Sequence, residues 1–213
     1  MMNKLISIIL PVLSFSSAAS ALEYGVGPLN ETDTIYFNSS AKLEFIQGRT
    51  QHINGRFFYD AEKPDSPVEA KLRVDLRTLE TGIAKRDEHM RDNHLHTVEN
   101  PYAYFELDSI QPFVPLNVPD SIYTTNASGK FYICGHHRKV TADLELTRNL
   151  LSNGGEEIIV RAKFSINLDK YKISRPKALF LKLAETIEIE CVFTGSTKIV
   201  SKPVELPDWP ELK

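Results

Sequence analysis

Apolar and polar residues alternate with a period of two along most of the chain from Thr34 onward. Successive side chains of a β-strand point to opposite faces, so this alternation is typical of strands with one buried face. The apolar positions of the clearest runs are Ala70, Leu72, Val74 and Leu76; Ala103, Phe105 and Leu107; Phe131 and Ile133; Val140, Ala142, Leu144 and Leu146; Val160, Ala162, Phe164, Ile166 and Leu168; and Ile187, Ile189, Cys191 and Phe193. Parallel strands need helical crossovers, which are almost absent, so the sheet is predicted to be antiparallel.

The number and length of these runs predict an all-β fold. About eight long antiparallel strands remove their exposed edges by closing into a barrel, which the sequence favours over the alternative, a β-sandwich. One short helix is predicted from Ala84 to about Asn93. Residues 22–33 lack periodicity and are expected to form a loose segment, and Asn126–Gly129 is expected to form a tight turn.

Charge limits the partners of the chain. Its 213 residues carry 25 Lys and Arg against 28 Asp and Glu, a formal net charge of -3. No field of one sign is available to attract a polyanion, so nucleic acid is not an expected partner.

The first 21 residues have the order of a secretory signal peptide. Lys4 precedes an apolar run from Leu5 to Phe15, and Ala19-Ser20-Ala21 supplies the small residues of a cleavage site. The run is about half the roughly 20 residues that a bilayer span needs, so no stable membrane span is expected. We expect cleavage at about Ala21, a periplasmic or secreted protein, a barrel domain over residues 22–201, and an extended Pro-rich tail over residues 202–213.

Residues that could carry catalysis are sparse. The sequence contains no Gly-x-Ser-x-Gly elbow and no phosphate-binding glycine loop. Glu188 and Glu190 alternate with a buried face and are interpreted as solvated residues rather than an acid–base pair. His94 and His96 could face one side of an extended segment, but no nearby Cys or carboxylate completes a zinc spacing. The sequence therefore predicts neither catalytic residues, nor a catalytic cofactor, nor a metal site.

The two cysteines leave one question open. An exported protein meets an oxidising compartment, so Cys134 and Cys191 could form a disulfide. Cys191 lies on the apolar face of its run, whereas Cys134 is out of phase with Phe131 and Ile133. Side chains on opposite faces do not bridge without a bulge, so two free thiols are predicted.

Several motifs resemble the YceI-like family of lipid- and polyisoprenoid-binding proteins. They are Leu79-x-Thr81-Gly82, Arg86-Asp87-x-His89-Met90-Arg91, Val98-Glu-Asn-Pro101 running into Phe105, Gly129-Lys-Phe131-Tyr-Ile133-Cys-Gly135, Val140-Thr-Ala-Asp-Leu144, Phe164-Ser-Ile166-Asn167 with Tyr171, and Glu185-Thr-Ile187-Glu-Ile189. Together they cover most of residues 34–197. Two features depart from the family: His136-His137-Arg138 follows the glycine, and Leu168 replaces a residue that is often polar or basic.

The resemblance implies an extended, lipocalin-like periplasmic barrel whose apolar tunnel holds an isoprenoid chain. The residues expected to line this tunnel are Phe45, Phe57, Leu72, Val74, Leu76, Phe105, Phe131, Ile133, Leu144, Phe164, Ile166 and Ile189. The short helix is expected to lie across the tunnel mouth, where Arg86, Asp87, His89 and Arg91 would meet the head group of the ligand. The alternative is that these charges only solvate a short surface helix and bond to its neighbours. Arginine suits an anionic head because its planar fork donates two hydrogen bonds.

The functional hypothesis is therefore an exported, non-catalytic carrier of an isoprenoid quinone, a polyprenol or a similar amphiphilic small molecule. Two alternatives remain open from the sequence: a secreted hydrolase or isomerase that acts on a lipid, and a structural module whose barrel is filled by its own side chains. Whether the chain forms a homodimer is also left open.

Overall fold

The computed structural model describes residues 21–27, 32–40, 44–60, 68–152, 154–175, 183–199 and 204–205. The expected signal peptide lies outside the described residues except for Ala21, and only residues 204 and 205 of the expected tail lie within them.

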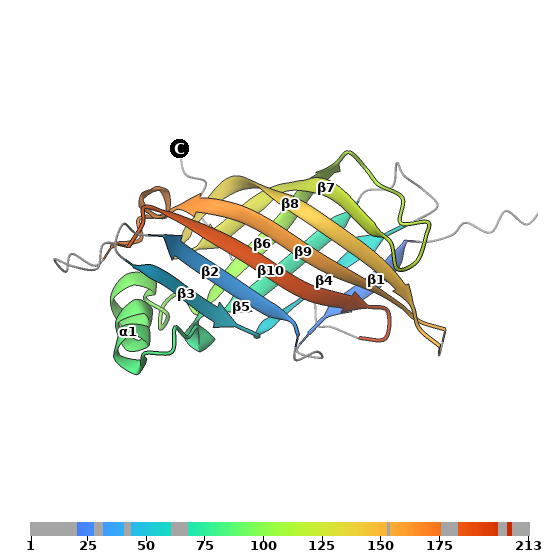
Figure 1. Cartoon of the computed structure of the whole chain (residues 1–213). Coiled ribbons are helices and arrows are strands. Elements are labelled where there is room, and N and C mark those ends of the chain that lie inside the picture. The colour runs from blue at the N-terminus through green and yellow to red at the C-terminus, as the bar shows by residue number, and fades with distance from the viewer. Residues whose placement is uncertain are drawn as a thin grey trace, which may run out of the picture.

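Ten antiparallel strands form one sheet within these residues. They are β1 (Leu22–Val26), β2 (Thr34–Ser40), β3 (Phe45–Thr50), β4 (Ile53–Tyr59), β5 (Glu69–Asp75), β6 (Tyr102–Gln111), β7 (Ile122–Ile133), β8 (His136–Leu150), β9 (Glu156–Asn167) and β10 (Thr186–Ser196). Eight of them close into a ring in the order β1-β4-β5-β6-β7-β8-β9-β10, and the β2–β3 hairpin extends the sheet from the edge of β10 (Figure 1). The predicted antiparallel barrel is confirmed.

Strand β1 closes the ring, which corrects the expectation of a loose segment there. All five of its residues pair with β4, and Gly25 and Val26 also pair with Ser196 and Gly195 of β10. Tyr24 and Val26 are buried. The strand is too short for its alternation to stand out in the sequence, and its pairing on both edges holds it in place.

The expected turn at Asn126–Gly129 is wrong, because these residues lie within β7. Gly129 pairs with Leu107 of β6, and a Cβ at this glycine would lie 2.4 Å from the Glu106 carbonyl oxygen. The glycine therefore permits a close approach of two strands rather than a reversal of the chain.

A helical insertion between β5 and β6 covers one end of the barrel, on the left of Figure 1. It contains a 3-10 turn (η1, Leu76–Thr78), the helix α1 (Ala84–His89) and a π turn (η2, Met90–Leu95). The predicted helix is thus present, but it ends two residues later than expected and changes its hydrogen-bond register on the way. A second 3-10 turn, η3 (Leu168–Tyr171), follows β9.

The opposite end of the barrel is covered by the loop between β6 and β7. Leu116 of this loop is fully buried, and its N–H donates to the Tyr59 hydroxyl at 2.8 Å. Arg148 donates to the Leu116 carbonyl at 3.3 Å and forms a salt bridge with Glu156 at 2.5 Å. No helix of the described residues is long and apolar enough to cross a membrane.

Gly55 supports a prediction about barrel closure. It pairs with Val26 of β1 and Leu72 of β5, its φ is +152°, and a Cβ would lie 2.2 Å from the Lys71 carbonyl oxygen. We expect Gly55→Ala to lower the free energy of unfolding by more than about 2 kcal/mol, because backbone overlap adds to the strain of the dihedral angle.

Gly154→Ala is the matched control for this prediction. Its φ is +79°, but no atom lies within 4 Å of an added Cβ, so it should cost only about 1 kcal/mol. Urea unfolding followed by circular dichroism measures both variants. Equal losses would show that the close contact at Gly55 has no role.

Candidate functional site

The barrel encloses an apolar cavity of about 650 Å³. Cavities of this size are typical of sites for small organic ligands. Its walls are the inward faces of the strands, whose aliphatic and aromatic side chains come from β2 to β10 and from the helical insertion. A barrel filled by its own side chains, one of the sequence-based alternatives, is therefore excluded.

Eleven of the twelve residues expected to line the tunnel lie on this cavity. They are Phe57, Leu72, Val74, Leu76, Phe105, Phe131, Ile133, Leu144, Phe164, Ile166 and Ile189. Of the two departures from the family pattern, Leu168 also lines the cavity. The other, His136-His137-Arg138, does not line it.

Phe45 is the exception: the prediction that it lines the tunnel is wrong. Its side chain points outward and the residue is 62% exposed, while the adjacent Ile46 is buried and lines the cavity. Strand β3 alternates from an exposed Phe45 to a buried Thr50, a phase fixed by pairing with β2. Two neighbouring apolar residues gave no indication in the sequence of which one faces inward.

The cavity also contains residues that the sequence analysis missed. Leu116 reaches it from the β6–β7 loop, and Ile173 from the segment after η3. Neither belongs to an alternating run, so no periodic pattern could identify them. Ile35 and Phe37 on β2 alternate as the other lining residues do, and that short pattern could have found them.

Charged and imidazole side chains line the cavity only at the end covered by the helical insertion, among the described residues. These are Glu44, Lys85, Arg86, His89 and His94. The cavity therefore has a polar mouth beside α1 and η2 and an apolar interior that reaches Leu116 at the other end.

Arg86 lies at the mouth as expected, but its guanidinium is already engaged. It donates to the Thr81 hydroxyl at 2.7 Å and to the Thr81 carbonyl at 3.1 Å, and it forms an ion pair with Glu44 at 3.2 Å. This arginine joins the insertion to the start of β3, and most of its donors are unavailable to a ligand.

Asp87 and Arg91 do not line the cavity, which corrects two of the four mouth residues. Asp87 is buried and accepts hydrogen bonds from the backbone N–H (2.8 Å) and the hydroxyl of Thr81. Arg91 donates to the Leu79 carbonyl at 3.1 Å. Both side chains fasten the helix to the turn that precedes it.

His89 lines the mouth, and so does His94, whose Nδ1 lies 2.9 Å from the Ser174 hydroxyl. Burial lowers the pKa of His94, and the nearby His89 and His96 lower it further. Nowhere in the described part of the chain do three His, Cys, Asp or Glu side chains come together as metal ligands.

Both cysteines are free thiols in the structure. Cys134 and Gly135 form the two-residue turn between β7 and β8, with φ of 50° and 74°, which is the geometry of a tight hairpin. The Cys134 thiol donates to the Leu95 carbonyl at 3.3 Å, whereas Cys191 lines the cavity. Cys134 therefore leaves the strand at the turn, and this explains why it is out of phase with Phe131 and Ile133.

The closed ring of strands has a polar mouth at one end and an apolar interior. These features place the protein in the class of small antiparallel β-barrels that enclose an apolar cavity. Residues 29–194 match the model of the YceI-like domain, so the chain belongs to the YceI-like family. A search of the curated proteins finds no match.

Solved structures share the fold at low sequence identity. A polyisoprenoid-binding domain from Saccharophagus degradans is 19% identical, with a TM-score of 0.64 over 82% of this chain and 98% of that one. BcnA from Burkholderia cenocepacia is 14% identical, with a TM-score of 0.59 over 76% of this chain and 95% of that one. The YceI protein of Campylobacter jejuni is 13% identical, with a TM-score of 0.60 over 74% and 88%.

The thiols give a testable prediction. Burial raises the pKa of both Cys134 and Cys191 to about 12. Because the thiolate is the reactive form, we expect neither to react with a maleimide in the folded protein at pH 8, and both to react after unfolding in urea without reductant. Mass spectrometry counts the labels. Two labels on folded protein, or none on unfolded protein, would contradict the prediction.

Proposed function

We propose that this chain is an exported, non-catalytic carrier that holds a polyisoprenoid or a similar long-chain amphiphile in its barrel. The observation that supports this most directly is the apolar cavity, whose described lining carries charged and imidazole side chains only at the helix end. Membership of the YceI-like family and the likeness to a domain described as polyisoprenoid-binding support the choice of ligand class.

The size of the cavity suits such a ligand. An apolar cavity of about 150 Å³ holds one benzene, so 650 Å³ has room for roughly 25 carbon atoms. Each buried methylene contributes about 0.8 kcal/mol, from which the cost of ordering the chain is subtracted. A prenyl tail has no polar group along its length, and the interior of this cavity presents it with none that is charged.

A lipid-acting enzyme is the second candidate, and the lining residues disfavour it. Beyond the mouth, the described cavity wall carries no charged side chain and no imidazole that could serve as a general acid or base. Glu188 and Glu190 point away from the interior and share an ion pair with Lys163 at 3.0 and 3.2 Å. Turnover of a prenyl ester by pure protein would favour this candidate.

Export rests on the sequence of residues 1–21. Strand β1 begins at Leu22, so cleavage after Ala21 would leave every described strand of the barrel intact. Native mass spectrometry of protein purified from its own host tests both parts of the proposal. We expect a mature chain that begins at Leu22 and a bound, solvent-extractable lipid. An intact Met1 would refute export, and the absence of saturable binding of any long-chain ligand to delipidated protein would refute the carrier role.

Ala162 offers a way to block the cavity without disturbing its mouth. It lies on β9 between Leu144 and Cys191, and all three residues line the cavity. We expect Ala162→Phe to weaken the binding of a C20 prenol by about tenfold or more, because the ring occupies volume that the tail needs.

Ser165→Phe is the control, since Ser165 is exposed on the outer face of the same strand. It should leave affinity unchanged. Fluorescence competition with a labelled lipid measures both variants, and thermal melting checks that they fold. If the two variants bind alike, the tail does not enter the barrel.

A further inference from the structure

Six residues of α1 and η2 line the cavity, and they fall into two rows. One row is Lys85, His89 and His94, and the other is Arg86, Met90 and Leu95. Along each row the spacing is four residues and then five. A regular α-helix repeats every 3.6 residues, so this second spacing needs an explanation.

The π turn η2 explains the five-residue spacing. Successive residues of an α-helix are about 100° apart, so His94 would point roughly 140° away from His89 if α1 simply continued. In η2 the hydrogen bonds join residues five apart; for example, the His96 N–H bonds to the Arg91 carbonyl. The wider turn brings the fifth residue back to the same face, and π turns of this kind are frequent at functional sites.

The charges on the two rows differ. Arg86 is neutralised by Glu44. Lys85 and His89 are exposed, and no hydrogen bond or ion pair engages either side chain within the described part of the chain. Glu44 is the acidic residue of the described lining, and it is already paired. Lys85 therefore carries a positive charge that no carboxylate of the described cavity wall balances, and the imidazoles of His89 and His94 lie in the same row and can donate hydrogen bonds beside it.

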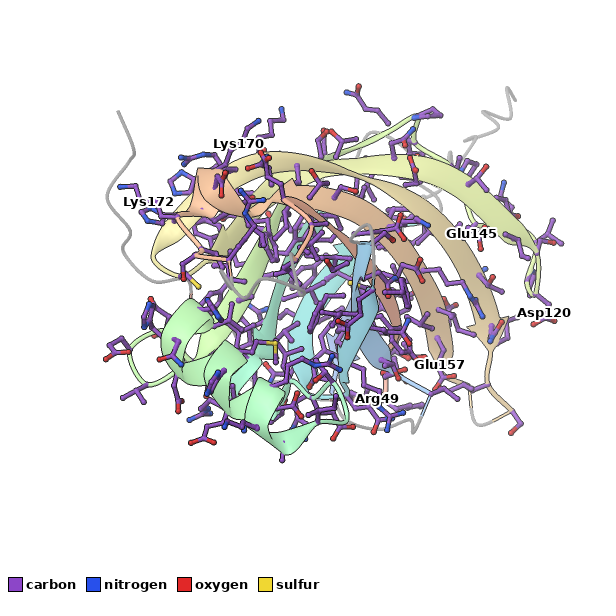
Figure 2. All side chains as sticks on the ribbon, turned by 60° about the vertical axis from the view of Figure 1, so that its left-hand side comes forward. Arg49, Asp120, Glu145, Glu157, Lys170 and Lys172 are labelled. Carbon is purple, nitrogen blue, oxygen red and sulfur yellow. The ribbon has the colours of Figure 1, made fainter. Side chains whose placement is uncertain are left out.

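The surroundings of the mouth add to this charge. Lys170 and Lys172 lie at the same end of the barrel as the helix, whereas Asp120 and Glu157 lie away from it (Figure 2). Lys170 and Lys172 therefore add positive charge at the end where the head group would lie, and a neutral head group gains nothing from them.

We propose that Lys85, His89 and His94 bind an anionic head group, a carboxylate or a phosphate, while the tail of the same ligand fills the cavity. This inference rests on the proposed carrier function and adds the chemistry of the ligand head. It assigns recognition to the row that the π turn aligns and not to Arg86 or Arg91, whose donors serve the fold.

Three ligands with the same C20 prenyl tail test the inference: geranylgeraniol, its monophosphate, and the corresponding carboxylic acid. We expect the wild-type protein to bind at least one of the two anions about tenfold more tightly than the alcohol, as charge-assisted hydrogen bonds imply. A preference for the phosphate or for the acid then identifies the head group.

Two variants separate direct contact from the general field. The double variant K85Q/H89Q should weaken binding of the anion more than binding of the alcohol, so that the preference for the anion falls to less than about threefold. K170Q removes one positive charge from the same end without touching the cavity lining and should keep the preference. Isothermal titration calorimetry measures the affinities.

The outcomes are distinguishable. Equal binding of all three ligands to the wild type would overturn the head-group inference and leave the carrier function standing. A loss in K170Q as large as in K85Q/H89Q would overturn the assignment to this row. If none of the three ligands binds, the proposed function itself fails. The wild-type comparison remains decisive even if a variant does not fold.

Discussion

The pairing of β1 with both β4 and β10 is the interaction on which the rest of the molecule depends. Five residues complete a ring of backbone hydrogen bonds, and only a closed ring separates an inside from an outside. Once the ring is closed, the period-two alternation places one half of the side chains in a common interior. At Gly55 and Gly129 the neighbouring strands of the ring leave no room for a Cβ.

Among the described residues, the charged side chains at the cavity lie on segments that connect the strands and not on the strands themselves. The strands supply an apolar wall, whereas the cations at the mouth come from one insertion between β5 and β6. The insertion is held by contacts that use up its own polar groups: Asp87 accepts from Thr81, Arg91 donates to Leu79, and Cys134 of a neighbouring turn donates to Leu95. These contacts leave the side chains of Lys85 and His89 at the cavity without a partner among the described residues. The groups that hold the insertion in place are therefore largely different from the groups that could recognise a ligand.

The fold and most of the cavity wall could be predicted because alternation reports directly on which face of a strand is buried. The prediction failed at positions where alternation does not decide which side chain faces inward. Phe45 and Ile46 are adjacent and apolar, and only the pairing of β3 with β2 decides between them. At the mouth, a search for arginines selected Arg86 and Arg91, although both serve the fold. The 3.6-residue period also could not reveal that His94 shares a face with Lys85, because a π turn has no signature in the composition of the segment.

The buried Leu116 has a further consequence for ligand choice. It lines the cavity at the end opposite the polar mouth, so a carrier of the proposed kind would take up an amphiphile with its tail first. A tail that is too short leaves an unfilled void against Leu116, and one that is too long holds its head away from the helix. Both misfits forfeit contacts, the first by lost dispersion and the second by exposed hydrocarbon. The distance between the β6–β7 loop and α1 would therefore select ligands by the length of their tails.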